Sequence, residues 1–428
     1  MRLMATGTQP AAVTAHDVED ARHRLSQVLA PTPLQRSDRL GARTGGEVWL
    51  KREDLQPVRS YKVRGAYNLI SQLGPDARAA GVVCASAGNH AQGLAYACAR
   101  LGVSGRVYLP RTTPRQKRDR IAVLGGDLVE IRVLGDTYDD AAAEAVADAA
   151  RTGATLVPAF DHPLTVAGQG TAVAEAFSQL EELGRALPDI VVIPVGGGGL
   201  LAGAATWLTE RHPEVRLVGV EPAGAACMAA ALQAGEPVTL PEIDGFVDGA
   251  AVRRAGAVTY PIIRDTKVEV VSVAEGRVCS EMLELYQADG IIAEPAGALA
   301  AAALGEVVRP HPEASVLVLL SGGNNDVSRY AEVVERALIH EGRKHYFLVD
   351  FPQEPGALRR FLDDVLGPDD DITLFEYVKR NNRETGPALV GVELGSPADL
   401  PALLARMEAS PPNIEKIPAN SPLFRYLL

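Results

Sequence analysis

The strongest constraint on the fold is a regular alternation between short apolar runs and longer alanine-rich stretches. The short runs have the length of strands, and the alanine-rich stretches have the length and composition of helices. We expect strands at residues 81–85, 104–109, 128–133, 154–158, 190–195, 216–220, 269–273 and 315–320. Strand and helix alternating at this spacing form parallel sheets with right-handed crossovers. The first four runs and the last four therefore predict two α/β lobes.

Composition agrees with an α/β protein and excludes several classes of partner. The 428 residues are 47% hydrophobic but only 5% aromatic, which is typical of helices packed closely on parallel sheets. The net charge of -12 repels phosphate groups, so we expect neither nucleic acid nor membrane partners. Residues 190–208 carry no charge, yet Pro194 and four glycines argue against a membrane span.

Cysteine usage and the first residues indicate the compartment. The four cysteines are far apart in the sequence and too few to staple a chain of this length. The first twenty residues lack the basic and then apolar order of an export signal. We therefore expect a cytoplasmic protein.

The pattern changes near residue 342. Strands are expected at residues 344–350, 371–379, 388–394 and 413–417, and helices at residues 355–366 and 398–408. This β-α-β-β-α-β order is the split arrangement of ferredoxin-like domains. We therefore predict an α/β part over residues 1–341 and a small α+β domain over residues 342–428.

Two segments of the first lobe could bind a ligand. Lys62 precedes an expected helix, although most lysines are simply solvated surface charges. Residues 86–93 join a strand end to a helix start, where free backbone N–H groups can bind an anion. A helix start capped by Ser86 or Asn89 is the alternative interpretation.

Four consecutive glycines follow the expected strand at residues 190–195. Glycine permits positive φ and close backbone approach, so successive amides can surround a phosphate at the positive end of the next helix. A plain tight turn does not need four glycines, because each one loses additional chain entropy on folding. We interpret residues 196–199 as a phosphate-binding loop.

The same loop permits a nicotinamide oxidoreductase as an alternative. Gly197, Gly199 and Ala202 fit a dinucleotide-binding spacing, and Glu221 ends the next strand, where a ribose-binding acid is found. However, these glycines follow a strand of the second lobe and not the first strand of the chain. A dinucleotide site would also leave the segment around Lys62 without a function. A Walker A loop is excluded because no Gly-Lys-Ser/Thr follows the glycines.

A further polar segment begins where the last expected strand ends. Ser321 opens a Ser-Gly-Gly-Asn-Asn sequence, and ligands of α/β sheets collect at the carboxyl ends of strands. As a single motif, this segment could equally form a turn. We expect no metal site, because no histidine belongs to a recognised zinc spacing.

In this order, the motifs resemble those of threonine ammonia-lyases, which belong to the tryptophan-synthase-β-like group of pyridoxal-phosphate enzymes. The matching segments are residues 31–34, 51–54, 60–66, 86–93, 196–199, 248–249, 294–295 and 321–324. The resemblance implies a two-lobed catalytic domain over residues 1–341. It also implies that residues 342–428 form a single ACT-like regulatory domain.

The resemblance implies roles for individual residues. Lys62 would hold pyridoxal phosphate covalently and act as the catalytic base, Asn89 would face the ring hydroxyl, and Ser321 would bond the pyridine nitrogen. The cofactor phosphate would bind Gly196, Gly197, Gly198, Gly199 and Leu200. The substrate carboxylate would bind Ser86, Ala87, Gly88, Asn89 and His90. The resemblance suggests no role for Glu294.

The implied reaction is deamination of L-threonine to 2-oxobutanoate and ammonia, the first step of isoleucine biosynthesis. The resemblance further implies a homotetramer that isoleucine inhibits. Three alternatives remain: a catabolic serine/threonine dehydratase, the oxidoreductase, and a non-catalytic amino-acid sensor. The sequence departs from the family at Tyr61, where phenylalanine is more usual.

Overall fold

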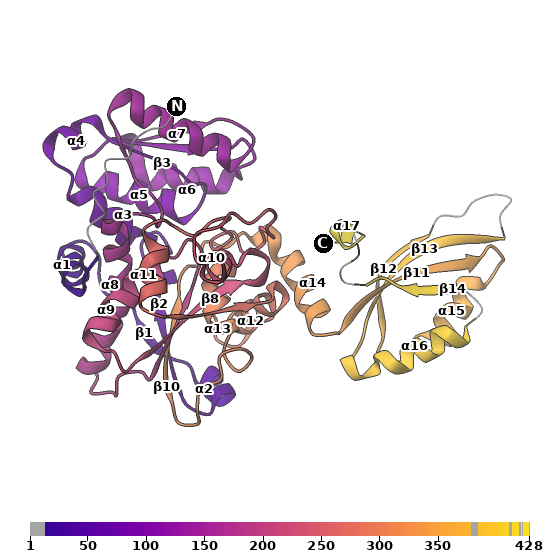
Figure 1. The fold of residues 1–428 in the computed structure, drawn as a ribbon. Helices are drawn as coiled ribbons and strands as arrows, with labels where there is room; N and C mark the ends of the chain where they lie inside the picture. Colours follow the sequence, from indigo (N-terminus) through magenta and orange to yellow (C-terminus); the bar gives the residue numbers. More distant parts are fainter. Residues whose placement is uncertain (1–12, 378–383, 411–412, 419–420, 422, 428) are drawn as a thin grey trace. The chain divides into compact units, whose positions relative to one another are not determined.

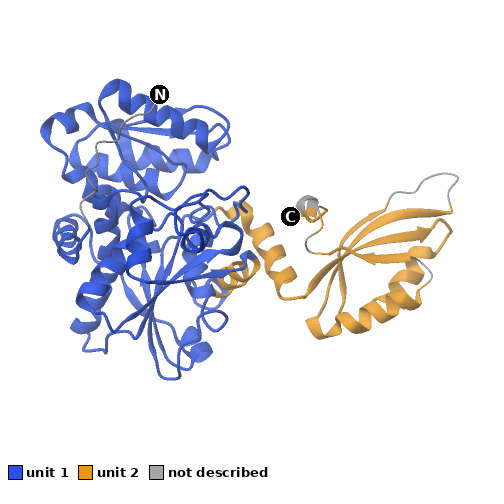
Figure 2. Ribbon diagram, in the orientation of Figure 1, with its two compact units in different colours: residues 1–275, 285–325 blue, residues 276–284, 326–428 orange. Residues whose placement is uncertain are grey.

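The computed structural model describes residues 13–377, 384–410, 413–418, 421 and 423–427 (Figure 1). The chain divides into two compact units (Figure 2). Unit 1 runs to Glu275 and includes Leu285–Asn325, and unit 2 contains Gly276–Glu284 and Asp326–Leu428. The domain boundary expected between residues 341 and 342 stays a prediction.

The first lobe of unit 1 contains a parallel sheet with the strand order β5-β4-β3-β6. Its strands are β3 (Val82–Ala85), β4 (Gly105–Leu109), β5 (Val129–Val133) and β6 (Thr155–Leu156). Helix α7 (Tyr138–Thr152) covers one face, and helices α5 (Asn89–Leu101) and α6 (Arg115–Gly125) cover the other (Figure 1). Both faces are therefore buried, and the four strands predicted for this lobe are confirmed.

The second lobe contains a sheet with the order β1-β2-β10-β7-β8-β9, in which only β1 runs antiparallel to its neighbour. Its strands are β1 (Leu34–Arg36), β2 (Glu47–Arg52), β7 (Ile190–Pro194), β8 (Arg216–Pro222), β9 (Glu269–Val273) and β10 (Ser315–Leu320). The four predicted strands are confirmed. Strands β1 and β2 were not predicted, because the charged residues of β2 conceal a buried strand.

Small residues let the helices of unit 1 approach closely. A Cβ atom on Gly203 of helix α9 (Gly199–Arg211) would lie 2.3 Å from the carbonyl oxygen of Val166 in helix α8 (Pro163–Glu182).

The uncharged residues 190–208 form strand β7, the glycine loop and most of α9. Within the described residues, no helix combines the length and apolar character that a membrane span requires.

Unit 2 contains an antiparallel sheet with the order β12-β13-β11-β14. The strands are β11 (Lys344–Pro352), β12 (Asp371–Tyr377), β13 (Thr385–Glu393) and β14 (Asn413–Lys416). Helices α15 (Ala357–Val365) and α16 (Leu400–Ala409) cover one face of this sheet (Figure 1). The predicted ferredoxin-like arrangement is confirmed. Residues 378 and 379, the predicted end of one strand, lie outside the described residues.

The other helices connect these layers. They are α1 (Ala15–Ser26), α2 (Asp38–Thr44), α3 (Lys62–Ser71), α4 (Pro75–Ala80), α10 (Cys227–Ala234), α11 (Thr259–Asp265), α12 (Glu275–Gln287), α13 (Pro295–Ala302), α14 (Tyr330–His340) and α17 (Phe424–Leu427). Helix α3 is important for the site, because Lys62 is its first residue.

Candidate active site

Lys62 and the segment after strand β3 line one cavity of about 400 Å³ in unit 1. Strand β3 ends at Ala85 and helix α5 begins at Asn89, so the chain turns between these residues. Residues Ser86, Ala87, Gly88, Asn89 and His90 all contribute to the cavity wall. The structure thus brings the predicted lysine and the predicted anion-binding segment together, while their roles stay predictions.

Tyr61, the residue before the lysine, contacts both Lys62 and the segment after strand β10. The Nζ atom of Lys62 lies 4.8 Å from the ring centroid of Tyr61, a distance at which the ring face attracts a cation. The backbone N–H of Tyr61 donates to the carbonyl oxygen of Ser321 over 3.1 Å. The lysine is therefore connected to the end of strand β10 through its neighbour.

His90 is a neutral, buried member of the wall. Burial, together with the nearby charge of Lys62, lowers the pKa of His90 to about 4. Its Nε2 atom lies 2.7 Å from the carbonyl oxygen of Val157, which can only accept, so Nε2 carries the proton. Within the described residues, Nδ1 is buried and has no hydrogen-bond partner. His90 can therefore offer a lone pair, but no charge, to a ligand.

The contact of the Ser86 hydroxyl agrees in part with the alternative interpretation, in which Ser86 caps the turn before the helix. Its Oγ atom accepts a hydrogen bond from the backbone N–H of Gly88 over 3.3 Å, as a turn cap does. Gly88 then occupies the N-cap position of helix α5 without a side chain. The backbone groups of this turn are consequently the best candidates for contact with an anion.

A chain of polar side chains crosses the cavity. Nδ2 of Asn89 donates to Oε1 of Glu294 over 2.6 Å, and Nδ2 of Asn324 donates to Oδ1 of Asn89 over 2.7 Å. Burial and the nearby Asp248 carboxylate raise the pKa of Glu294 to about 7. Asn324 belongs to the Ser-Gly-Gly-Asn segment, but no separate role for it could be predicted from that motif.

The glycine loop lies behind the cavity wall. Gly196 approaches Ala250, whose neighbours Gly249 and Ala251 line the cavity. A Cβ atom on Gly197 would lie 2.3 Å from the ring of Phe160, and Gly198 has a φ of +93°. The loop therefore requires glycine for both space and conformation.

The amides of the loop stand at the start of helix α9, where the first N–H groups of a helix have no partner within it. The side chain of Leu200 is buried in the hydrophobic core of the second lobe. Leu200 could therefore contribute only its backbone to a bound phosphate. The loop residues and Ser321 lie outside the lining of the cavity that contains Lys62.

Ser321 directly follows strand β10, as predicted. It is 2% exposed, and its hydroxyl donates to the carbonyl oxygen of Ala296 over 3.1 Å. This hydroxyl can rotate toward another acceptor without any movement of the backbone. Its contact with a ring nitrogen stays a prediction.

Glu221 does not support the dinucleotide alternative. It is fully buried, and its carboxylate accepts the backbone N–H groups of Met228 and Ala229 over 2.7 and 2.8 Å. These contacts hold the carboxylate against the start of helix α10. The acid that a ribose would need is therefore already engaged.

The structure adds residues to the cavity for which sequence reasoning predicted no role. Nζ of Lys117, in helix α6, forms an ion pair of 2.8 Å with Oδ2 of Asp248, and both residues line the cavity. Gln92, Tyr138 and Ile243 also contribute to it. No local pattern marks Lys117 or Asp248 as partners, because 131 positions separate them.

Among the described residues, no group of three His, Cys, Asp or Glu side chains could hold a metal ion.

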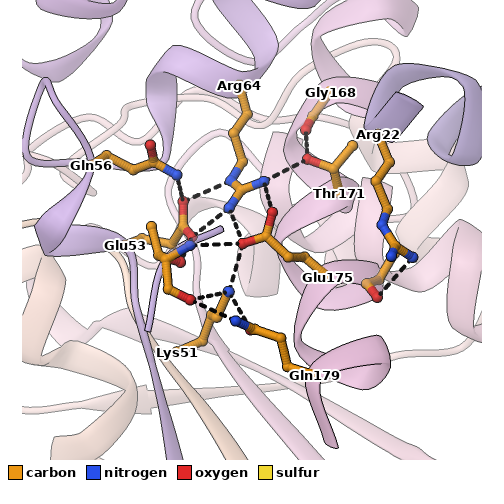
Figure 3. A network of polar contacts seen from close by, with 11 residues as sticks. Arg22, Lys51, Glu53, Gln56, Arg64, Gly168, Thr171, Glu175 and Gln179 are labelled. Atoms are coloured by element: carbon orange, nitrogen blue, oxygen red, sulfur yellow. Dashed lines mark hydrogen bonds and ion pairs between the residues drawn. The ribbon is translucent and has the colours of Figure 1, made fainter. Parts of the chain in front are cut away.

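A buried ionic cluster supports the start of helix α3 (Figure 3). Arg64 donates to both Glu53 and Glu175, over 2.7 and 2.8 Å, and Lys51 forms an ion pair of 2.6 Å with Glu175. The two positive charges of Arg64 and Lys51 equal the two negative charges of the carboxylates. Burial of each charge, which is unfavourable alone, is therefore compensated by its partners. The cluster ties helix α3, which begins at Lys62, to strand β2 and helix α8.

The cluster controls the ionisation of its own members. Burial alone would raise the pKa of Glu175, but Arg64 and Lys51 together lower it to about 2. Burial lowers the pKa of Lys51, against the opposing effect of Glu175. Lys51 and Glu53 of the Lys-Arg-Glu-Asp motif at residues 51–54 belong to this cluster, whereas Arg52 and Asp54 form their own ion pair of 2.8 Å.

Comparisons with known proteins agree with this geometry. Residues 25–322 match the family described as pyridoxal-phosphate dependent enzyme, and residues 335–427 match the C-terminal regulatory domain of threonine dehydratase. The chain is 63% identical over 414 residues to the biosynthetic L-threonine dehydratase IlvA of Mycobacterium tuberculosis, covering 96% of this chain and 95% of that protein.

More distant relatives point to the same family. The biosynthetic L-threonine dehydratase IlvA of Bacillus subtilis is 45% identical over 408 residues, covering 95% of this chain and 96% of that protein. The solved structure of the processed form of threonine deaminase isoform 2 from Solanum lycopersicum superposes with a TM-score of 0.70 at 34% identity. The superposition covers 79% of this chain and 99% of that one.

Proposed function

Because the chain belongs to the pyridoxal-phosphate-dependent enzyme family, among its biosynthetic threonine dehydratases, we propose that Lys62 is its catalytic residue and L-threonine its substrate. The protein is an enzyme of the threonine ammonia-lyase type with pyridoxal phosphate as its cofactor and a C-terminal regulatory domain. The products are then 2-oxobutanoate and ammonia.

Residues of the cavity lining, together with the glycine loop and Ser321 outside it, have the chemistry that this cofactor needs. Lys62 supplies the amine for covalent attachment, and Asn89 supplies an amide for the ring hydroxyl. The glycine loop at the start of helix α9 presents backbone amides at the positive end of the helix, as a phosphate requires. Ser321 supplies a hydroxyl for the ring nitrogen. The lack of room for side chains along the loop supports this assignment.

When bound, pyridoxal phosphate supplies an electron sink for negative charge on the substrate Cα. The Nζ atom of Lys62 removes the Cα proton. It can act as the general base because it lines the cavity in which the substrate binds. Backbone N–H groups of residues 86–90 bind the substrate carboxylate, and the neutral His90 adds no opposing or competing charge.

The observation that carries the proposal is that Lys62 and residues 86–90 line one cavity in a chain of this family. The test is to incubate the purified enzyme with L-threonine and, separately, with L-serine, and to measure the 2-oxo acids and ammonia formed. A kcat/KM for threonine above that for serine supports the biosynthetic function. The reverse order supports the catabolic alternative, and no product from either would refute the proposal.

We propose that isoleucine inhibits the enzyme through residues 342–428. Pro355 and Gly356 precede helix α15, and Gly356 occupies its N-cap position with a φ of +87°. A helix start can present amides to an amino-acid carboxylate, and such binding requires a coupling free energy between two sites. Removal of residues 342–428 should leave an active enzyme that isoleucine no longer inhibits. Undiminished inhibition of the shortened enzyme would contradict this proposal.

We also propose that the enzyme works in the cytoplasm as a homotetramer. The buried positions of Cys84, Cys98, Cys227 and Cys279 as free thiols fit a reducing compartment. The family resemblance supports the tetramer. Light scattering of the purified protein should give four times the mass of the chain, and the mass of a monomer or dimer would refute the assembly.

A further inference from the structure

The side-chain amide of Asn89 is held from both sides by distant residues. Nδ2 of Asn324 donates to Oδ1 of Asn89 over 2.7 Å and also to the carbonyl oxygen of Val58 over 2.8 Å. On the other side, Nδ2 of Asn89 donates to Oε1 of Glu294 over 2.6 Å. Four groups therefore form one continuous chain from Val58 to Glu294.

The polarity of this chain permits only one orientation of the two amides. The carbonyl of Val58 can only accept, so Asn324 must present Nδ2 to it. The same Nδ2 faces Asn89, which must therefore present Oδ1. If the amide of Asn89 turned over, its oxygen would meet the carboxyl oxygen of Glu294 and its nitrogen would meet the nitrogen of Asn324. Both hydrogen bonds would be lost.

Burial makes this orientation costly to change. Glu294 is 4% exposed, and a Cβ atom on Gly322 would lie 2.2 Å from its Oε1 atom. The backbone N–H of Glu294 also donates to the carbonyl oxygen of Gly322 over 3.1 Å. Glycine at position 322 thus makes room for the carboxyl group beside Asn89. A buried polar group that loses its hydrogen-bond partner destabilises the folded state.

We propose that Glu294 and Asn324 are positioning residues that orient the Asn89 amide so that it donates a hydrogen bond into the cavity. Nδ2 carries two hydrogens, and Glu294 takes one of them, which leaves the other for an acceptor oxygen. The inference rests on the proposed function, in which Asn89 faces the ring oxygen of pyridoxal phosphate. A fixed donor there favours the deprotonated ring oxygen, whereas a turned amide would favour the protonated one.

The test uses the absorption spectrum of the cofactor in the purified holoenzyme, measured as a function of pH. Protonation of the ring oxygen moves the absorption band to shorter wavelength. Asn324→Asp has the same shape as the native side chain but replaces the donor with an acceptor, so it should turn Asn89 over. We expect the pH midpoint of the spectral change to rise by about one unit or more, because the turned amide favours the protonated ring oxygen. Asn324→Ala, the second variant, should shift the midpoint in the same direction by a smaller amount.

Glu294 is tested by a conservative pair. Glu294→Gln keeps an acceptor for Asn89 and should keep the wild-type band, while Glu294→Ala removes the acceptor and should shift it. In an Asn89→Ala background, Glu294→Ala and Asn324→Ala should cause no further shift, because both act through the Asn89 amide. A purely structural effect would persist in that background.

The outcomes separate this inference from the proposed function. If Asn89→Ala shifts the spectrum while the Asn324 and Glu294 variants do not, the positioning role is refuted and the cofactor site stands. If Asn89→Ala changes neither the spectrum nor the cofactor affinity, Asn89 does not face the ring oxygen, and both assignments fail. Shifts from Glu294→Ala and Asn324→Ala that persist undiminished beside Asn89→Ala would also refute the positioning role.

Discussion

The hydroxyl of Thr259 donates a hydrogen bond to the carbonyl oxygen of Gly197 over 2.6 Å. Thr259 is fully buried at the start of helix α11. The carbonyl of Gly197 and the N–H of Gly198 belong to one planar peptide and point in opposite directions. The bond therefore fixes where the amide of Gly198 points, in the loop that we assign to the cofactor phosphate.

Thr259→Val should weaken cofactor binding by about tenfold, because a lost neutral hydrogen bond costs about 1 kcal/mol or slightly more. Titration of the apoenzyme with pyridoxal phosphate, followed by absorption, measures the affinity. Thr259→Ser retains the hydroxyl and is the matched control. Equal affinities of the valine variant and the wild type would show that this bond does not support the loop.

The buried ionic cluster predicts a loss of stability when one charge is removed. Lys51→Met leaves Glu53 and Glu175 with Arg64 as their remaining cation. We expect the free energy of unfolding to fall by about 3–5 kcal/mol, as for other broken buried pairs. Arg115→Met, in an exposed pair with Asp119, is the control and should cost less than about 1 kcal/mol. Denaturant unfolding that finds equal costs would contradict the role of the cluster.

Glu294 predicts a pH dependence of stability in the apoenzyme. Burial and the charge of Asp248 raise its pKa from 4.5 to about 7, against the opposing effects of Asn89, Lys117 and Lys62. The folded state then binds more protons than the unfolded state between these values, so stability falls as the pH rises. Relative to Glu294→Gln, the wild type should lose up to about 3 kcal/mol from pH 4.5 to 7. A constant difference across this range would argue against the raised pKa.

The regulatory proposal predicts that Gly356→Ala weakens inhibition by isoleucine while the basal rate is retained. A side chain at a φ of +87° strains the backbone that begins helix α15. Gly235→Ala introduces similar strain at a φ of +79° in the catalytic lobes and is the matched control. Isoleucine titrations of the initial rate compare the two. Loss of inhibition in the control alone would place the effector elsewhere.

Much of the fold could be predicted because its signals are local. The strands of both lobes and the β-α-β-β-α-β order of unit 2 follow from apolar runs between helical stretches. Strand β2 could not be predicted in this way, since Lys51 is charged and yet fully buried. Its burial depends on Glu175, which is 124 positions away and on another element.

The same reasoning explains which parts of the site were missed. The segments around Lys62 and Asn89 carry local sequence patterns and line one cavity. The chain from Asn324 through Asn89 to Glu294 joins residues more than 200 positions apart, and no local pattern marks it. Leu200 belongs to the predicted loop by position, but its side chain packs in the core.

Of the lysines that the structure describes, Lys62 and Lys117 line the cavity, and we assign Lys62 to hold the cofactor. Lys117 forms an ion pair with Asp248, whereas Lys62 begins helix α3, whose Arg64 belongs to the buried ionic cluster. Lys62→Ala should accordingly abolish ammonia production from threonine, because the covalent anchor and the base would be lost together.

The most direct test is to reduce the holoenzyme with borohydride, which makes the bond between lysine and cofactor permanent, and to map the modified peptide by mass spectrometry. The account predicts that the cofactor is found on Lys62. Cofactor attached to Lys117, or to any other lysine, would contradict it.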